Sequence, residues 1–299
     1  MEPPPVSMRG IFPPIPTPFD AAGELDLKAL ASNFHRWNTF PLAGYAVLGT
    51  NGEMPYLSDA EKLAYFEAAR ALIPAGKLFL AGCGCESTHS TIALVKKAAA
   101  LGADVALLIN PSYYKSKMDA AALTDYYRRV ADASPIPVSI YNMPANTMVD
   151  LPADLVIALS AHPNIAAVKD SSGNLSKLGE IIRNSRPGFQ ALAGSAGFLY
   201  PAVALGAVGG VLALANIAPQ QCCDLLTLAA REKHADAKAL QLRLIAPNTA
   251  VTARFGVAGL KAAMDMAGLY GGNPRSPLQP LSAGQRDVLR GILTEAEIV

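Results

Sequence analysis

Short apolar runs recur along this chain at a nearly regular interval, and most are followed by a segment whose apolar residues have helical spacing. The runs begin roughly 20 to 35 residues apart, about the length of one strand, one helix and their loops. Parallel strands need crossovers of this kind, and eight such units predict a closed barrel. The predicted strands are Gly10–Ile15, Gly44–Leu48, Leu78–Ala81, Val105–Ile109, Val138–Tyr141, Ala166–Val168, Gln190–Ala193 and Gly210–Leu214.

Several segments between these runs carry clear helix signals. Leu57–Ile73 begins with Ser58 followed three residues later by Glu61, the pattern of a capping box. Ser87–Leu101 and Ala120–Ala133 have apolar residues at helical spacing and lead into the next strand. A doubly wound open sheet is the alternative, but no strand is followed by the Gly-x-Gly-x-x-Gly turn typical of it. The sequence therefore predicts an α/β protein with a TIM (β/α)8 barrel.

The last part of the chain differs from this repeat. Polar and apolar residues interleave through Leu225–Ala246, and Gly-Gly-Asn-Pro at 271–274 interrupts the helical pattern that follows. We therefore predict a barrel over residues 1–218 and a C-terminal helical extension over 219–299. We expect the extension to pack on the barrel, so that the two form one structural unit.

The charge balance excludes several kinds of partner. The chain has 25 basic and 24 acidic residues, and a net charge of +1 is too small for nucleic-acid or anionic-membrane binding. One uncharged stretch, Pro187–Cys223, contains a run over Ala196–Ile217 that is long enough to span a bilayer. Pro201 and the pair Gly209-Gly210 interrupt that run, and no basic cluster follows it. We therefore expect a buried strand, a short helix and another buried strand there.

Cysteine and histidine positions do not form a metal-binding pattern. The cysteines are Cys83, Cys85, Cys222 and Cys223, and the histidines are His35, His89, His162 and His234. We predict no metal and no other cofactor, and we expect the cysteines to be small buried packing groups in a reducing compartment. The start, Met1–Gly10, lacks the features of a secretory signal or a transit peptide. We expect a cytoplasmic protein, or a mitochondrial one if a presequence is missing from this chain.

Polar and aromatic residues cluster where the predicted strands end, which is where barrel enzymes place their active sites. Lys169 follows an apolar strand, and an amine partly desolvated there would favour its neutral, nucleophilic form. Tyr141 lies 28 residues earlier, one βα unit, so both side chains can rise from adjacent strands. On position alone, Lys169 can equally mark where the strand reaches water. Tyr141 can equally be a core tyrosine bonded to a backbone carbonyl.

Three motifs carry a resemblance to a known family. Gly49-Thr50-Asn51-Gly52-Glu53, Tyr141-Asn142-Met143-Pro144 and Val168-Lys169-Asp170 resemble the N-acetylneuraminate lyase and dihydrodipicolinate synthase family. The resemblance runs from about Gly10 to the last helices. Other stretches are most similar to the members of this family that cleave 4-hydroxy-2-oxoglutarate to pyruvate and glyoxylate. They are Ser134–Val138, Pro144–Thr147, Leu192–Gly197 and Ala204–Gly210.

The resemblance implies a class I aldolase with a small 2-oxo acid as substrate. In this reading Lys169 forms the Schiff base and Tyr141 relays protons. Thr50 and Asn51 match the positions that hold the pyruvyl carboxylate. Tyr114 matches a tyrosine that reaches into a neighbouring subunit and completes a chain of hydroxyls with Thr50 and Tyr141. A homotetramer built as a dimer of dimers is therefore implied.

Substrate choice depends on positions farther from the lysine. Ser171, Gly194 and Ser195 match positions that contact the distal part of the substrate, and we expect Glu53 to order its loop. Asn146 stands where dihydrodipicolinate synthases have an arginine for the second substrate's carboxylate, and it offers neither a charge nor a bidentate fork. This departure disfavours the dihydrodipicolinate synthase reaction. It leaves cleavage of 2-keto-3-deoxy sugar acids as an alternative.

Two functions of other classes are weaker alternatives. A serine hydrolase would need Gly-x-Ser-x-Gly, but Ala193 stands where the first glycine of that motif around Ser195 should be. A barrel that only binds a keto acid would have little reason to combine Lys169, Tyr141 and Thr50. The sequence therefore favours an enzyme that forms a Schiff base.

Overall fold

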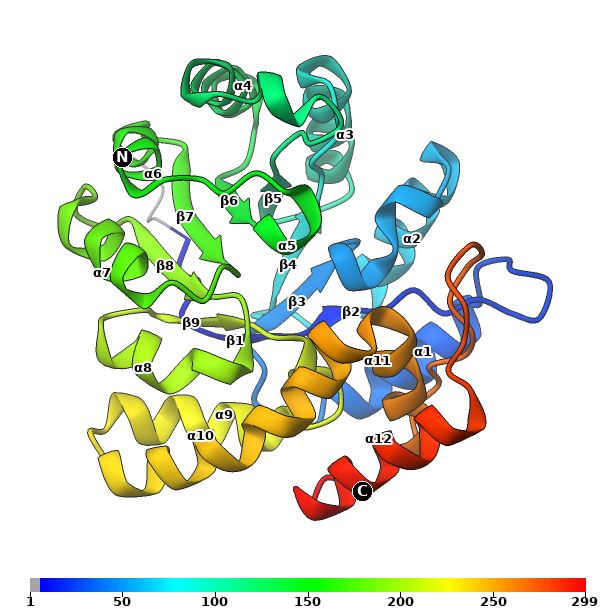
Figure 1. The fold of residues 1–299 in the computed structure, drawn as a ribbon. Helices are drawn as coiled ribbons and strands as arrows, with labels where there is room; N and C mark the ends of the chain where they lie inside the picture. The colour runs from blue at the N-terminus through cyan, green and yellow to red at the C-terminus, as the bar shows by residue number, and fades with distance from the viewer. Residues whose placement is uncertain (1–5) are drawn as a thin grey trace.

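Residues 6–299 are described by a computed structural model, in which one parallel sheet closes into a barrel (Figure 1). Residues 1–5, half of the proline-rich start considered above, lie outside the described residues. The strands follow one another in chain order around the ring. They are β1 (Gly10–Phe12), β2 (Pro14–Ile15), β3 (Gly44–Val47), β4 (Leu78–Gly82), β5 (Val105–Ile109), β6 (Val138–Asn142), β7 (Ile165–Asp170), β8 (Gln190–Ala193) and β9 (Gly209–Val211).

The ring closes through the first strand, which Pro13 divides into β1 and β2. β1 pairs with β9, and β2 pairs with β3. Proline has no N–H to donate, but the Pro13 carbonyl still accepts from the N–H of Ala46 at 3.0 Å. β1 and β2 thus act as one strand of a (β/α)8 barrel, which confirms the predicted fold class.

Two predicted strands differ from the observed ones by two or more residues at the carboxyl end. The strand predicted over Ala166–Val168 is longer, because β7 continues through Lys169 and Asp170 and pairs there with β6. The strand predicted over Gly210–Leu214 stops at Val211, because the chain turns into the 3₁₀ helix η5 (Ala213–Asn216). The residues that lengthen β7 are charged, and the residues that follow β9 are apolar, so in neither case does the apolar pattern locate the end of the strand.

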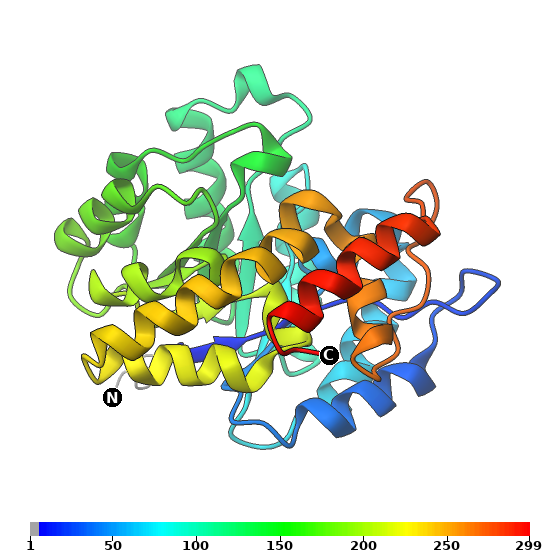
Figure 2. The same cartoon turned by 60° about the horizontal axis from the view of Figure 1, so that its bottom comes forward.

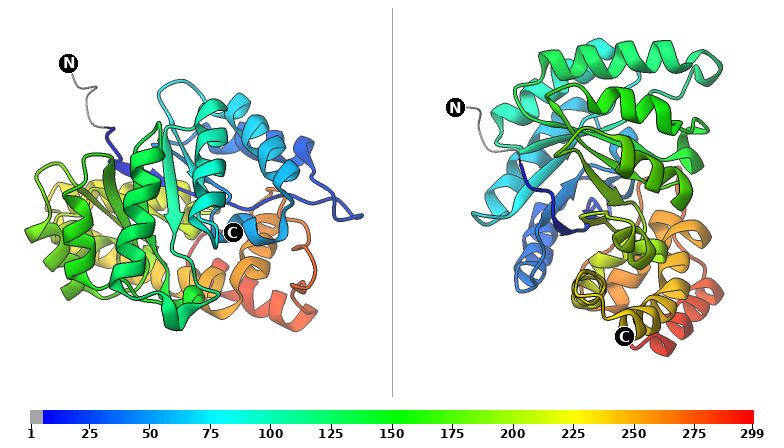
Figure 3. Two further views of the ribbon diagram at one scale, coloured as in Figure 1. Left: turned by 90° about the horizontal axis from the view of Figure 1, so that it is seen from above. Right: turned by 90° about the vertical axis from the view of Figure 1, so that its left-hand side faces the viewer.

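Helices surround the barrel on the outside (Figure 3). Ser58 forms the predicted capping box with Glu61. The helices of the barrel region are α1 (Leu27–Trp37), α2 (Asp59–Leu72), α3 (Thr88–Ala100), α4 (Ala120–Ala133), α5 (Pro144–Thr147), α6 (Ala153–Ser160), α7 (Leu175–Asn184) and α8 (Leu199–Ala204). Short 3₁₀ helices lie in the loops: η1 (Thr50–Gly52), η2 (Met54–Tyr56), η3 (Lys115–Lys117) and η4 (Ala196–Phe198).

Two separate apolar clusters account for the stability of this arrangement. The larger one lies between the strands and the surrounding helices. The smaller one fills the inside of the barrel, because alternate residues of each strand point to opposite faces. Its buried members are Met8, Phe12, Ala46, Leu80, Val105, Leu107, Tyr141, Ala167, Leu192 and Val211. Tyr141 is the only one of these with a polar tip, and it comes from the carboxyl end of its strand.

The C-terminal part is helical and lies against one side of the barrel (Figure 2). It contains α9 (Pro219–Ala230), α10 (His234–Thr249), the π-helix η6 (Ala250–Arg254), α11 (Gly256–Met266) and α12 (Ala283–Glu295). Helix α9 packs against β1 and α8, the place of the eighth barrel helix. The boundary after residue 218 stays a prediction, and we propose to move it to the end of α9, so that the extension begins with α10.

The remaining composition-based expectations concern the cysteines and the uncharged stretch. Cys83, Cys222 and Cys223 are buried and Cys85 is partly buried; all four are free thiols. Burial raises the pKa of the Cys223 thiol to about 11, as expected for a packing group. Within residues 6–299, no helix is both long and apolar enough to cross a membrane. In the same part of the chain, no three His, Cys, Asp or Glu side chains gather as a metal site.

Candidate active site

Lys169 and Tyr141 lie side by side at the carboxyl edge of the barrel. They are directly paired residues of β7 and β6, and the exposed fractions of the two residues are 3% and 4%. The Lys169 Nζ lies 3.7 Å from the centroid of the Tyr141 ring. The lysine therefore ends inside the protein, and the alternative in which it reaches water does not hold.

Thr50 joins this pair from a third strand end. It opens η1, the first turn after β3, and its Oγ1 lies 3.1 Å from the Tyr141 hydroxyl, where either oxygen can donate. The Tyr141 hydroxyl thus contacts a side chain and not the backbone carbonyl of the core-tyrosine alternative. Asn51 follows in the same 3₁₀ turn and is partly exposed. An amine, a phenol and a hydroxyl therefore meet at one place, a set of groups that can bond to a carbonyl and relay protons.

Glu53 holds the Thr50 loop in place. Its backbone has φ 54°, a left-handed conformation that is unfavourable for a residue with a side chain. Its buried carboxylate lies 2.6 Å from Lys261 Nζ on α11 and accepts a hydrogen bond from the Arg275 backbone N–H at 2.8 Å. Lys261 also donates to the Asn273 carbonyl at 3.0 Å. The extension therefore anchors the loop, the ordering role expected for Glu53.

Lys261 is a residue that the sequence reasoning did not single out. Its side chain has an exposed fraction of 0%, and burial lowers its pKa even though Glu53 acts to raise it. A signal was present in the sequence, because Lys261 is the only charged residue in the apolar run Phe255–Met264. A lone charge on an otherwise apolar helix predicts a buried partner.

A second polar network lies directly behind the lysine and the tyrosine. Asn142, the residue after Tyr141, donates from Nδ2 to Asp150 and to Asp170, both at 2.8 Å. Lys177 of α7 pairs with the same two carboxylates, at 2.5 Å and 3.2 Å. Partial burial acts to raise the pKa of Asp150, but hydrogen bonds from Lys177 and Asn142 outweigh it and hold the pKa below its usual range. The network fixes the ends of β6 and β7, and with them the two site residues.

The residues predicted for the distal part of the site meet at the ends of β7 and β8. The Oγ of Ser171 is buried and has no hydrogen-bond partner within residues 6–299. A Cβ at Gly194 would lie 1.9 Å from that oxygen, so only glycine fits there. Ser195 caps η4 and accepts from the Gly197 N–H at 3.2 Å, which is not the geometry of a nucleophile elbow. Asn146 lies exposed on α5.

Tyr114 does not join the other residues within one chain. The residue is 70% exposed, and its ring packs edge-on against the ring of Tyr113 with centroids 5.0 Å apart. Glu86 orders this loop, because its carboxylate accepts from the backbone N–H groups of Ser112 and Tyr113 at 3.0 Å and 2.9 Å. Two adjacent exposed tyrosines are a surface feature typical of a contact with another molecule.

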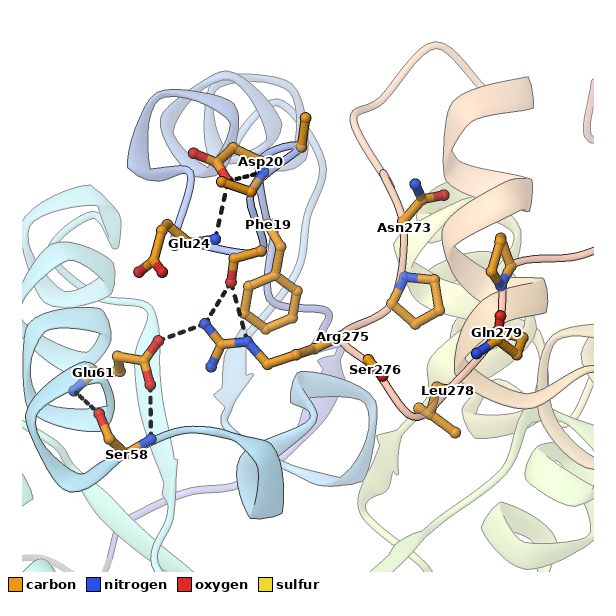
Figure 4. Close-up of a pocket in the computed structure, with 15 residues that line it drawn as sticks. Phe19, Asp20, Glu24, Ser58, Glu61, Asn273, Arg275, Ser276, Leu278 and Gln279 are labelled. Atoms are coloured by element: carbon orange, nitrogen blue, oxygen red, sulfur yellow. Dashed lines mark hydrogen bonds and ion pairs between the residues drawn. The ribbon is translucent and has the colours of Figure 1, made fainter.

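One hollow of about 840 Å³ lies between the Phe19–Glu24 loop and the segment Asn273–Pro280, and Lys169 is not among the residues that line it. Figure 4 shows Arg275 at its centre, reaching toward Glu61. The Arg275 guanidinium already donates to the carbonyls of Gly23 and Tyr56 and to Glu61. Since these bonds occupy most of its donors, the hollow has no free cation to hold a ligand, and we assign it a structural role.

The fold and the strand-end cluster together are typical of a barrel enzyme, with the candidate site at the carboxyl ends of the strands. The chain belongs to the dihydrodipicolinate synthetase family, whose sequence profile matches residues 7–296. Its members are pyruvate-dependent lyases and aldolases, so this protein is a lyase of that family. This confirms the resemblance drawn from the motifs.

Relatives and solved structures cover nearly the whole chain. A probable mitochondrial 4-hydroxy-2-oxoglutarate aldolase of Emericella nidulans is 34% identical over 96% of this chain and 94% of its own. A 4-hydroxy-tetrahydrodipicolinate synthase of Methanothrix thermoacetophila is also 34% identical, over 96% of both chains. Dihydrodipicolinate synthase of Bacillus anthracis superposes with a TM-score of 0.93 at 28% identity, covering 97% of this chain and 98% of its own. A prophage protein of this family from E. coli K12, solved with pyruvate, has a TM-score of 0.92 at 28% identity, covering 98% and 100%.

Proposed function

We propose that this protein is a class I aldolase that cleaves 4-hydroxy-2-oxoglutarate to pyruvate and glyoxylate through a Schiff base on Lys169. The observation that carries the proposal is the position of Lys169 Nζ, buried and 3.7 Å from the Tyr141 ring, whose hydroxyl contacts Thr50. A desolvated amine beside a phenol has what carbonyl condensation requires, a nucleophile and a proton donor in reach of one atom. The resemblance implies no metal and no other cofactor for this chemistry.

The reaction follows from these groups. The neutral Lys169 amine attacks C2 of the substrate, and the Tyr141 phenol supplies the proton with which the C2 oxygen leaves as water, which gives an iminium ion and a Tyr141 phenolate. Tyr141, helped by Thr50, removes the proton of the C4 hydroxyl, the C3–C4 bond breaks, and its electron pair moves into the iminium. Glyoxylate leaves and an enamine remains on Lys169. Protonation at C3 and hydrolysis then release pyruvate and restore the amine.

The two carboxylates of the substrate are assigned to different parts of the site. The η1 turn offers the Thr50 hydroxyl and backbone N–H groups to the carboxylate next to C2, with Asn51 beside it. Ser171, Gly194 and Ser195 lie at the ends of the next strands and would contact the C5 carboxylate. Backbone and hydroxyl donors are suited to carboxylates without supplying a full positive charge.

Asn146 supports this substrate over that of dihydrodipicolinate synthases. The position offers a neutral amide where an arginine would bind the second substrate. Overall identity does not decide the matter, because an aldolase and a synthase are both 34% identical to this chain. Cleavage of 2-keto-3-deoxy sugar acids is the alternative within the family.

The exposed pair Tyr113 and Tyr114 supports a homotetramer built from two dimers. Within one chain the Tyr114 hydroxyl has no role, whereas in a dimer it would complete the chain of hydroxyls with Thr50 and Tyr141.

We place the protein in the cytoplasm, or in the mitochondrion if a presequence precedes this chain.

Trapping of the Schiff base tests the chemistry. The protein is incubated with pyruvate, reduced with borohydride, digested and mapped by mass spectrometry. We expect a stable pyruvyl adduct on Lys169. Lys169→Arg is the matched control, because it keeps the charge but removes the nucleophile. An adduct on another lysine contradicts the role of Lys169, and no adduct in the wild type favours a barrel that only binds keto acids.

Substrate identity needs a separate comparison. Release of pyruvate is measured from 4-hydroxy-2-oxoglutarate and from 2-keto-3-deoxygluconate, and condensation of pyruvate with aspartate semialdehyde is measured in parallel. We expect the highest kcat/KM for 4-hydroxy-2-oxoglutarate. A higher kcat/KM for either of the others would overturn the assignment but not the mechanism.

A further inference from the structure

The extension brings one amide side chain to the distal end of the candidate site. Asn248 lies near the end of α10, has an exposed fraction of 4%, and donates from Nδ2 to Ser195 Oγ at 2.9 Å. Pro247 precedes it inside the helix and the π-helix η6 follows it. Short π-helical segments occur frequently at functional sites, where they change the direction of side chains. Nothing in the motifs considered above points to this residue.

The hydrogen bonds of Ser195 leave its own proton free. Its Oγ accepts from the Gly197 N–H and from Asn248 Nδ2, so both lone pairs are used. Within residues 6–299, no acceptor faces the Ser195 hydroxyl hydrogen. The hydroxyl is therefore fixed as a donor, and Asn248 is the residue that fixes it.

Two further buried polar atoms at the distal end of the candidate site lack partners. Ser171 Oγ, in contact with Gly194, and Asn248 Oδ1 are both buried without a hydrogen bond in residues 6–299. Ser171 also belongs to the site side of the sheet. The Ser171 N–H extends the pairing of β7 with β6 by donating to the Asn142 carbonyl at 2.9 Å. Ser171 comes two residues after Lys169, so both side chains point to the same face of the sheet. Since buried polar atoms in proteins are almost always paired, these atoms require water or a ligand.

We propose that Asn248 is a positioning residue that selects substrates with a distal carboxylate, by holding the Ser195 hydroxyl as a donor for the carboxylate to which Ser171 is also assigned. The inference rests on the proposed function and names the part of the site that recognises C5. Two neutral hydroxyl donors suit the two oxygens of a carboxylate. They replace the charged fork that the chain lacks at Asn146.

Asn248→Asp tests this idea because it reverses the hydrogen bond. An aspartate accepts where the amide donated, so the Ser195 proton turns toward Asp and away from the substrate. The added negative charge also repels a distal carboxylate. For 4-hydroxy-2-oxoglutarate we expect kcat/KM to fall about 10- to 100-fold, mainly through KM. For 4-hydroxy-2-oxopentanoate, which has a methyl group in place of that carboxylate, we expect less than about a threefold change.

Asn248→Ala and Gln241→Leu complete the experiment. Asn248→Ala adds no charge and should reduce the preference for the dicarboxylic substrate by a smaller factor. It provides the test if Asn248→Asp folds poorly. Gln241 lies on the same helix, accepts from the Tyr200 N–H and donates to the Ala196 carbonyl. Gln241→Leu therefore loosens the contact of α10 with the loop after β8 without removing a hydrogen bond of Ser195. We expect it to lower Tm and to leave the ratio of the two kcat/KM values unchanged.

The outcomes separate this inference from the proposed function. Pyruvate has no distal carboxylate, so borohydride trapping on Lys169 should be equal in the wild type and in all three variants. If trapping is normal but Asn248→Asp and Asn248→Ala affect both substrates equally or not at all, the inference is wrong and the aldolase assignment stands. If the wild type neither traps pyruvate nor cleaves either substrate, the proposed function is wrong and the inference falls with it.

Discussion

Replacing Lys261 by methionine tests the link between the extension and the site loop. The change removes the ammonium 2.6 Å from the Glu53 carboxylate, and both side chains are at most 1% exposed. Methionine preserves much of the packing volume, so the main effect is electrostatic. Among residues 6–299, Glu53 would keep only the Arg275 backbone N–H as a partner, and a buried carboxylate would lose its compensating charge.

The size of the effect can be worked out from this burial. Removing one partner of a buried ion pair costs about 3–5 kcal/mol of unfolding free energy. With about 2.1 cal/mol/K of unfolding entropy per residue, a chain of 299 residues has about 0.6 kcal/mol/K. We therefore expect Lys261→Met to lower Tm by about 5 to 8 °C. Lys62→Met removes an ion pair with Asp59, whose side chain is 87% exposed, and should shift Tm by less than about 2 °C.

Differential scanning calorimetry at one fixed protein concentration measures these shifts, because assembly would make Tm depend on concentration. The decisive comparison is the double variant Glu53→Gln with Lys261→Met. If an uncompensated charge causes the loss, neutralising Glu53 should recover at least half of it, roughly 3 °C or more. A double variant as unstable as the sum of the two single variants would refute the reasoning. We also expect Lys261→Met to raise the KM for pyruvate, since Glu53 orders the Thr50 loop.

Four further predictions follow from single contacts. Tyr141→Phe should lower turnover of 4-hydroxy-2-oxoglutarate about 10²- to 10⁴-fold while slowing trapping of pyruvate much less; equal losses would mean that the ring only shapes the pocket. The Arg275 hydrogen bond lowers the pKa of Glu61 to about 2, so its contribution to stability is complete above about 4.5 and is lost as pH falls toward 2. Glu61→Gln should therefore flatten the fall in Tm over that range, and an unchanged slope would contradict this. Gly194→Ala places a Cβ 1.9 Å from Ser171 Oγ and should cost about 1–3 kcal/mol in urea unfolding; a neutral effect would show that the loop can shift. Tyr114→Ala should lower the mass measured by light scattering and also lower turnover, whereas an unchanged mass and rate would remove the argument for a shared site.

The candidate catalytic residues could be predicted from the sequence because they lie in barrel strands or in the first turn after one. Apolar runs mark the strands, and the rule that barrel sites lie at the strands' carboxyl ends points to Lys169, Tyr141 and Thr50. The pairing of Lys169 with Tyr141 also follows from their separation by one βα unit. Where the prediction erred, as at the end of β7, backbone pairing with β6 extended the strand through polar residues that carry no apolar signal.

The contacts made by the extension could not be predicted in the same way. Lys261 and Asn248 are more than fifty residues away in the chain from Glu53 and Ser195, and neither belongs to the repeating βα units. Their partners depend on how a helix packs across the barrel, which periodicity does not determine. Burial of a lone charge or amide can be suspected from an apolar helix, but the residue that it pairs with has to be read from the structure.

The candidate catalytic pair lies on the barrel strands, whereas Asn146 and Asn248 lie outside them, and this separation bears on substrate specificity in the family. The barrel strands pair Lys169 with Tyr141, and in the proposed mechanism the imine involves only the pyruvyl part, whatever aldehyde half is used. In our proposal, discrimination falls to Asn146 on α5 and to Asn248 on the extension, elements that can change without disturbing the strand ends. An aldolase and a synthase can therefore be equally similar to this chain over its length. Two or three side chains outside the strands, and not overall identity, should separate the reactions.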